Sequence, residues 1–299
     1  MPILEARGLV KRFGKIVAVD NLDITIGRGD IIGLIGPNGA GKTTTIRLCL
    51  GILRRDRGIV KLFGYDPFYE PKSRERVGVI FENPSFPETT TVGKFLSHTA
   101  RIYGVGIERV REVLKVTGLV EKQSSSIKTL SAGQKQRLAF AHALIHEPEL
   151  IITDEPTNNL DPLGRSEVLD LLSNLNKDYG ITILISSHVL PELSRIINRI
   201  ALINRGKIVF RGSPSEIENM LKEKIIRIRV NDIDRMIKLL SQYFDRVEVR
   251  GASVIVYTDN PGEVYRIVGE IMIRHRVMVY GVESLEIQLE ELLRKITRS

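Results

Sequence analysis

Short apolar stretches alternate with turn residues through the first 35 residues of the chain, a pattern that is typical of β-strands. It predicts strands at 4–10, 16–19, 22–26 and 30–35. Longer periodic stretches and short apolar runs further along predict three helices and two buried strands, at 44–53, 92–117, 132–146, 150–153 and 181–186. Strands that alternate with helices favour an α/β fold with a mostly parallel sheet.

The pattern changes after the Gly-Ser-Pro turn at 212–214. Beyond it the predicted elements are strand, helix, two strands, helix and strand, at 224–230, 232–243, 246–250, 253–258, 261–274 and 276–282. This order matches a small ferredoxin-like α+β sandwich. A last helix over 284–297 would place four apolar residues on one face, Leu285, Leu289, Leu292 and Ile296. We therefore expect two domains, 1–215 and 216–299.

Composition narrows the class of protein. Hydrophobic residues make up 42% of the chain and charged residues 27%, which excludes a largely disordered protein. The single cysteine, Cys49, excludes a disulfide scaffold. No apolar run approaches the roughly 18–20 residues that span a membrane, and Glu5 and Arg7 come too early for a secretory signal peptide. We expect a soluble, cytoplasmic protein.

The formal net charge of +8 is spread along the chain without a basic tail or block. A solvated, mildly basic surface is the simplest interpretation, so we expect no nucleic-acid partner. The alternative interpretation is that part of the excess positive charge binds phosphate ligands.

A motif for phosphate binding follows the predicted strand at 30–35. Residues 36–43 read Gly-Pro-Asn-Gly-Ala-Gly-Lys-Thr and fit the pattern G-x-x-x-x-G-K-[ST], with a helix predicted after it. Glycines let consecutive backbone N–H groups curl around phosphate oxygens, and the helix start adds positive potential. Lys42 can reach the β- and γ-phosphates, and Thr43 can offer its hydroxyl to Mg²⁺. The alternative, a tight turn with a solvated lysine, fits this context poorly.

A pair of acids supports the same chemistry. The buried strand at 150–153 ends in Asp154 and Glu155. An acid at the carboxyl end of such a strand can hold Mg²⁺ directly or through water, and the next carboxylate can deprotonate an attacking water. The pattern is weak alone but strong beside the phosphate loop.

Between these elements lies Leu-Ser-Ala-Gly-Gln-Lys-Gln-Arg at 130–137. Here the chain resembles the ATP-binding subunits of ABC transporters, over about residues 3–215. The resemblance implies an ABC-type P-loop ATPase with a mixed sheet core, a helical subdomain at about 84–148 and the ferredoxin-like domain behind it. Ser131 with Gln134 three residues later is also a capping box, and a capped helix start can bind a γ-phosphate presented by another subunit.

The resemblance assigns a role to each matching residue. ATP would contact Phe13, Gly36, Pro37, Asn38, Gly39, Ala40, Gly41, Lys42, Thr43 and Thr44 of one subunit, and Ser131, Gly133, Gln134 and Asp161 of a second. The Mg²⁺ ligands would be Thr43, Glu82 and Asp154, and the catalytic residues Glu155, His188 and Lys42.

Two positions depart from the family pattern. Glu82 stands where most members carry glutamine, so it can still hold Mg²⁺ but lacks the amide donor and adds negative charge. Ala132 replaces the first signature glycine, and we expect little harm because its backbone N–H is retained.

The resemblance also implies a working assembly. Two copies, or two related chains, would close on MgATP, hydrolyse it to ADP and phosphate, and drive separate polytopic membrane subunits from the cytoplasmic face of the membrane. The ferredoxin-like domain resembles the C-terminal extension of exporter-type subunits, so export is expected. An importer ATPase and a soluble ABC ATPase acting on ribosomes or DNA are the alternatives.

Overall fold

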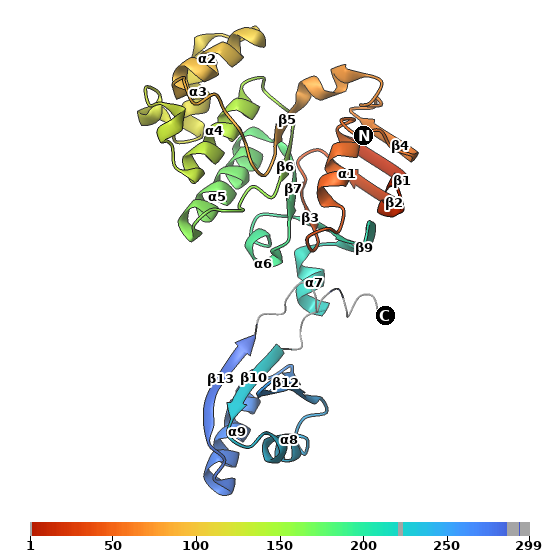
Figure 1. The fold of residues 1–299 in the computed structure, drawn as a ribbon, viewed down its shortest axis with the longest axis vertical. Coiled ribbons are helices and arrows are strands. Elements are labelled where there is room, and N and C mark those ends of the chain that lie inside the picture. Colours follow the sequence, from red (N-terminus) through yellow and green to blue (C-terminus); the bar gives the residue numbers. More distant parts are fainter. Residues whose placement is uncertain (1, 221–223, 286–292, 294–299) are drawn as a thin grey trace. The chain divides into compact units, whose positions relative to one another are not determined.

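The chain divides into two compact units, Met1–Pro214 and Ser215–Ser299 (Figure 1). The structure is a computed structural model, and it describes residues 2–220, 224–285 and 293. Within the described residues, no helix combines the length and the apolar character that crossing a membrane requires.

A six-stranded sheet forms the centre of the first unit, in the order β5-β6-β7-β3-β8-β9. Its strands are β3 (Ile31–Ile35), β5 (Val77–Ile80), β6 (Leu150–Asp154), β7 (Thr182–Ser187), β8 (Arg199–Asn204) and β9 (Lys207–Gly212). Neighbouring strands pair in parallel except for β8 and β9. Every residue of β3, β6 and β7 is buried, because parallel strands are covered on both faces. The mostly parallel sheet predicted from the sequence is confirmed.

A second, antiparallel sheet has the order β2-β1-β4, with strands β1 (Leu4–Phe13), β2 (Ile16–Ile26) and β4 (Arg57–Leu62). The prediction of separate strands at 16–19 and 22–26 is wrong, since β2 is continuous. Asn21 has a φ of 50°, which asparagine tolerates better than most residues, so the register shifts without ending the strand.

Helix α1 (Lys42–Cys49) contacts both sheets, through β4 and β6 (Figure 1). Cys49 at its end is fully buried, and burial raises the pKa of its thiol to about 12. The thiol therefore stays protonated and takes no part in chemistry at neutral pH.

A helical region precedes β6 in the chain. It contains α2 (Val92–Ile102), α3 (Ile107–Val116) and α4 (Ala132–Leu144), which contact one another (Figure 1). The single helix predicted over 92–117 is wrong because Gly104, with a φ of 69°, separates α2 from α3. Short 3₁₀ turns lie at Pro71–Arg76, Val120–Lys122 and Ile127–Thr129. Three further helices follow before residue 221: α5 (Pro162–Tyr179), α6 (Leu190–Leu193) and α7 (Pro214–Met220).

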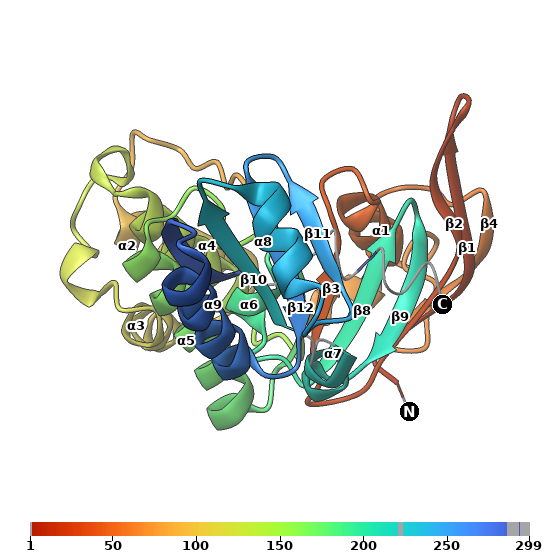
Figure 2. The same cartoon turned by 90° about the horizontal axis from the view of Figure 1, so that it is seen from below.

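The second unit has the predicted β-α-β-β-α-β order. Its elements are β10 (Lys224–Val230), α8 (Ile233–Leu240), β11 (Val247–Arg250), β12 (Ser253–Thr258), α9 (Pro261–His275) and β13 (Val279–Leu285). The strands form an antiparallel sheet in the order β11-β12-β10-β13, and α8 and α9 pack on it side by side (Figure 2). Ser284 and Leu285 end β13 instead of beginning a helix. Leu293 is helical and buried, whereas Leu289, Leu292 and Ile296 of the predicted helix lie outside the described residues.

Candidate active site

The phosphate loop connects the buried strand β3 to helix α1. Two of its glycines are required by close backbone approaches: a Cβ on Gly36 would lie 2.3 Å from the carbonyl oxygen of Ile203, and one on Gly41 would lie 2.4 Å from that of Ala18. Gly41 also has a φ of 105°. The loop therefore packs between β2 and β8, and α1 begins directly after it, so the N-terminus of the helix adds positive potential at the loop.

Lys42 is a buried lysine at the start of α1. Its Nζ donates to the carbonyl oxygens of Gly36 (2.7 Å) and Pro37 (3.1 Å) and lies 3.0 Å from Glu155 Oε1. The ammonium group therefore lies between the loop and the carboxylate, where a phosphate group in the loop would compete with Glu155 for it.

Glu155 comes directly after β6, with its backbone in the left-handed region (φ 49°). Its N–H donates to Ser186 Oγ (3.0 Å), and Ser186 Oγ in turn donates to Asp154 Oδ1 (2.5 Å). Its Oε2 lies 2.9 Å from His188 Nδ1. A non-glycine residue in such a conformation costs about 1–3 kcal/mol and persists where surrounding contacts fix it, as they do here.

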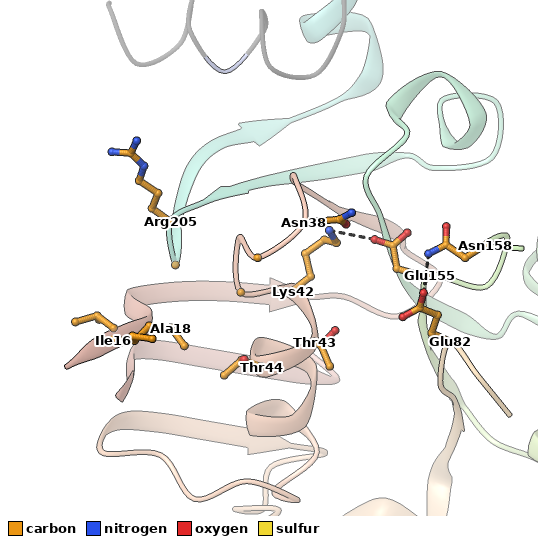
Figure 3. A pocket seen from close by; sticks show the side chains of 14 residues that line it. Ile16, Ala18, Asn38, Lys42, Thr43, Thr44, Glu82, Glu155, Asn158 and Arg205 are labelled. Carbon is orange, nitrogen blue, oxygen red and sulfur yellow. Dashed lines mark hydrogen bonds and ion pairs between the residues drawn. The ribbon is translucent and has the colours of Figure 1, made fainter. Parts of the chain in front are cut away.

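Lys42 and Glu155 line a cavity of about 450 Å³ (Figure 3). Its walls are formed by Ile16, Val17, Ala18, Asn38, Gly39, Gly41, Lys42, Thr43, Thr44, Glu82, Glu155, Asn158, Arg205 and Gly206. Glu155, Glu82 and Asn158 lie at one end, and Ile16 and Arg205 at the other (Figure 3). The cavity is large enough for a small-molecule ligand.

Eight predicted site residues line the cavity, namely Asn38, Gly39, Gly41, Lys42, Thr43, Thr44, Glu82 and Glu155. Gly36, Pro37 and Ala40 belong to the same loop, and His188 reaches the site through Glu155. Phe13 is not among the lining residues. It is half exposed and pairs with Ile16 across the β1–β2 hairpin.

The residues assigned to a second subunit make local contacts within the chain. Ser131 and Gln134 form the predicted capping box at α4, with Gln134 N–H donating to Ser131 Oγ (3.3 Å) and Ser131 N–H to Gln134 Oε1 (3.1 Å). Asp161 caps α5 by accepting from Gly164 N–H (3.0 Å). None of these residues, nor Gly133, lines the cavity of its own chain.

The proposed Mg²⁺ ligands differ in their access to the cavity. Thr43 and Glu82 line it, whereas Asp154 is buried behind Glu155 and is held by Ser186. Among the described residues no cluster of three or more His, Cys, Asp or Glu side chains could hold a metal ion. Mg²⁺ commonly uses one or two protein oxygens together with substrate phosphates, so this donor set fits an ion that arrives with a nucleotide.

Several lining residues were missed by the sequence analysis. Asn158 donates from Nδ2 to Glu82 Oε1 (2.9 Å; Figure 3), which ties the loop containing Glu82 to the loop after Glu155. Ile16, Val17, Ala18, Arg205 and Gly206 come from two hairpins. The sequence Asn-Arg-Gly-Lys at 204–207 signals a turn, but nothing in it indicates packing against the phosphate loop.

Comparison with known proteins identifies the family. Residues 19–158 match the ABC transporter family model. The chain is 38% identical over 245 residues to the bacitracin transport ATP-binding protein of Bacillus licheniformis, covering 81% of this chain and 80% of that protein. It is 36% identical to the daunorubicin/doxorubicin resistance ATP-binding protein of Streptomyces peucetius, covering 77% and 71%.

Solved structures agree with this assignment. An ATP-binding cassette of an ABC transporter in its ADP conformation superimposes with a TM-score of 0.67 at 27% identity, covering 74% of this chain and 95% of that one. The predicted fold class and the resemblance stated from the sequence are therefore confirmed. Its relatives include ATP-binding proteins of export and resistance transporters. The chain belongs to the ATP-binding proteins of ABC transporters and is an ATPase.

Proposed function

We propose that two copies of this chain, or this chain and a related one, close on two MgATP molecules and power export through separate membrane subunits. The observation that carries the proposal is the cluster of Lys42, Glu155 and His188 at one end of the cavity, in which Lys42 and Glu155 are buried. In this cluster the carboxylate of Glu155 contacts the phosphate-binding Lys42 through Oε1 and His188 through Oε2.

The chemistry follows from the contacts of Glu155. Its carboxylate accepts the proton of a water whose oxygen bonds to the γ-phosphorus, while the bond from that phosphorus to the β–γ bridging oxygen breaks. His188 orients the carboxylate through Oε2. When phosphates enter the loop, Lys42 transfers its hydrogen bonds to them and releases Oε1 for the water.

Thr43 and Glu82 would hold Mg²⁺, which neutralises charge on the phosphates, while Asp154 would act through water. Because Glu82 lines the cavity and also accepts from Asn158, a shift of its carboxylate toward the metal would loosen the link to the loop at 155–161. That loop ends in Asp161, which we assign to the dimer interface.

The shared site explains the residues that make only local contacts. The capping box uses the N–H groups of Ser131 and Gln134, which leaves those of Ala132 and Gly133, at the start of α4, for an anion, although this helix start is absent from the cavity of its own chain. A γ-phosphate held by a second subunit would supply that anion. This arrangement supports a dimer that depends on ATP.

The helical region is the surface that we assign to the membrane subunits. Large apolar side chains are exposed on it, among them Ile102, Tyr103, Ile107 and Val120, and a membrane subunit docked there would cover them. Phe86 packs edge-on against Phe95 of α2 at 5.4 Å. The loop that begins at Glu82 therefore runs from the cavity into this region and provides a mechanical connection.

Export is supported by the relatives, whose names describe bacitracin transport, daunorubicin/doxorubicin resistance and Nod factor export. The test is purification of the complex from native membranes in detergent. A co-purifying polytopic subunit, with ATP hydrolysis stimulated by reconstitution into vesicles, is expected. Co-purification of ribosomal RNA or DNA without a membrane protein would contradict the proposal, including its peripheral location on the cytoplasmic face.

A further inference from the structure

The turn between β8 and β9 carries an arginine in an unfavourable conformation. Asn204 pairs with Lys207, so Arg205 and Gly206 form a two-residue loop. Their φ angles are 48° and 78°, as the type I′ turn of a β-hairpin requires. Asparagine and glycine are the residues preferred at such positions. Arginine at this position therefore lowers the stability of the turn, which points to a function for its side chain.

The turn is held against the phosphate loop. Gly206 N–H donates to the carbonyl oxygen of Ala40 (2.8 Å), and Asp20 N–H donates to that of Gly206 (2.9 Å). A Cβ on Gly206 would lie 2.8 Å from the carbonyl oxygen of Ala18. The backbone of Arg205 is thus fixed beside the loop, while its side chain is exposed.

The guanidinium group makes no hydrogen bond or ion pair with any described residue, yet Arg205 lines the cavity. It lies at the end opposite Glu155, across from Ile16 and Ala18 (Figure 3). Ile16 and Val17 are exposed apolar side chains on this facing strand. The guanidinium extends away from Ile16 in Figure 3, so an exposed apolar strand edge and a long, rotatable cation flank one mouth of the cavity.

The direction of a bound nucleotide follows from the other end. Lys42 and Glu155 mark the position of the γ-phosphate, so the base and ribose extend toward Ile16 and Arg205. A guanidinium plane stacks well on an aromatic ring and donates to hydroxyl groups. We propose that Arg205 contacts the base and ribose and determines affinity for the nucleoside part of the ligand. This inference rests on the proposed nucleotide site.

The experiment is to compare Arg205→Asn with the wild-type chain by calorimetric titration of ATP and of inorganic tripolyphosphate. A stacking contact of this kind changes affinity by about threefold to thirtyfold, so the Kd for ATP should rise by that factor. The Kd for tripolyphosphate should be unchanged. The melting temperature without nucleotide should be equal or higher, because asparagine suits the turn better.

Arg211→Asn is the matched control, since Arg211 lies on the same hairpin, pairs with Asp23 and is outside the cavity. It should leave both affinities unchanged. Equal weakening of ATP and tripolyphosphate binding by Arg205→Asn would show a phosphate contact and overturn the inference, as would an unchanged Kd for ATP. Failure of the wild-type chain to bind either ligand would instead refute the nucleotide site itself.

Discussion

The two ends of the cavity differ in how deeply their side chains are buried and in how many partners those side chains have. At the Glu155 end, Lys42 and Glu155 are each 6% exposed and are joined by an ion pair and by hydrogen bonds to the loop and to His188. At the other end, Ile16 is 69% exposed and the Arg205 side chain has no partner among the described residues.

This difference indicates that the Glu155 end determines the rate of hydrolysis and that the exposed rim contributes to binding affinity. A buried, fully paired cluster is preorganised, so removing one member leaves another charge without its partner. An exposed rim contributes through contacts that form only with the ligand. We therefore expect changes at the Glu155 end to affect turnover strongly and changes at the rim to affect binding modestly.

The largest effect is expected for Glu155→Gln. Removing a general base typically slows a reaction by about 10²–10⁴-fold, so ATP turnover should fall by that factor. ATP binding should be retained or tightened, because Lys42 no longer has a competing carboxylate, and the protein should accumulate as a dimer in ATP. Phosphate release and size-exclusion chromatography measure the two outcomes.

Glu263→Gln is the control for that variant, because Glu263 pairs with Arg266 in the second unit and does not line the cavity. It should hydrolyse ATP at the wild-type rate. Unchanged turnover in Glu155→Gln would contradict the assignment of the general base.

The next effect is expected for Lys42→Ala. Hydrogen bonds to charged groups contribute about 1.5–3 kcal/mol, so the Kd for ATP should rise roughly tenfold to a hundredfold. Stabilisation by ATP in a thermal melt should shrink accordingly. Lys207→Ala, which removes an exposed lysine that pairs with Asp20, should melt like the wild type with and without ATP. Full stabilisation of Lys42→Ala by ATP would show that the loop binds phosphate without it.

The smallest effect concerns two histidines that do not line the cavity, His142 and His146. Burial lowers the pKa of His142, which stacks on Phe95, and of His146, which stacks on Tyr103. The unfolded chain therefore binds more protons just below pH 6.5, so stability is full above that pH and is lost as the pH falls below it. His142→Phe should lessen the drop in melting temperature between pH 7.5 and 5.5.

His98→Phe is the control, because His98 is exposed on the same helix as Phe95. It should leave the drop in melting temperature unchanged. An equal reduction by both variants would mean that burial of His142 is not the cause.

The phosphate end of the site could be predicted because each of its two motifs is local in sequence, although the contact between the motifs is long-range. A glycine-rich loop, a lysine and a strand ending in two acids impose short-range spacings that only a few geometries satisfy, and Lys42 and Glu155 indeed meet at 3.0 Å. The parallel sheet was predictable for a related reason, since strands buried on both faces leave uninterrupted apolar runs.

The rim could not be predicted because it depends on long-range packing. Arg205 lies far along the chain from Gly41, and it reaches the site only because the β8–β9 turn packs on the phosphate loop. Partly exposed strands such as β4 and β9 gave weak patterns and were not predicted. Two residues with positive φ were also misinterpreted. Asn21 was expected to separate two strands but lies within the continuous strand β2, whereas Gly104 was expected within one helix but separates α2 from α3.

The central claim is that two subunits complete each site, and mixing two inactive variants tests it most directly. Lys42→Ala lacks a working phosphate loop but keeps its signature helix, whereas Ser131→Ala lacks the helix cap but keeps its loop. Each variant alone should hydrolyse ATP poorly. In the mixture, the loop of one chain meets the intact signature of the other, so activity should recover and rise with protein concentration. Ser131→Ala that is fully active alone, or a mixture that stays inactive although mixed dimers form, would contradict the account.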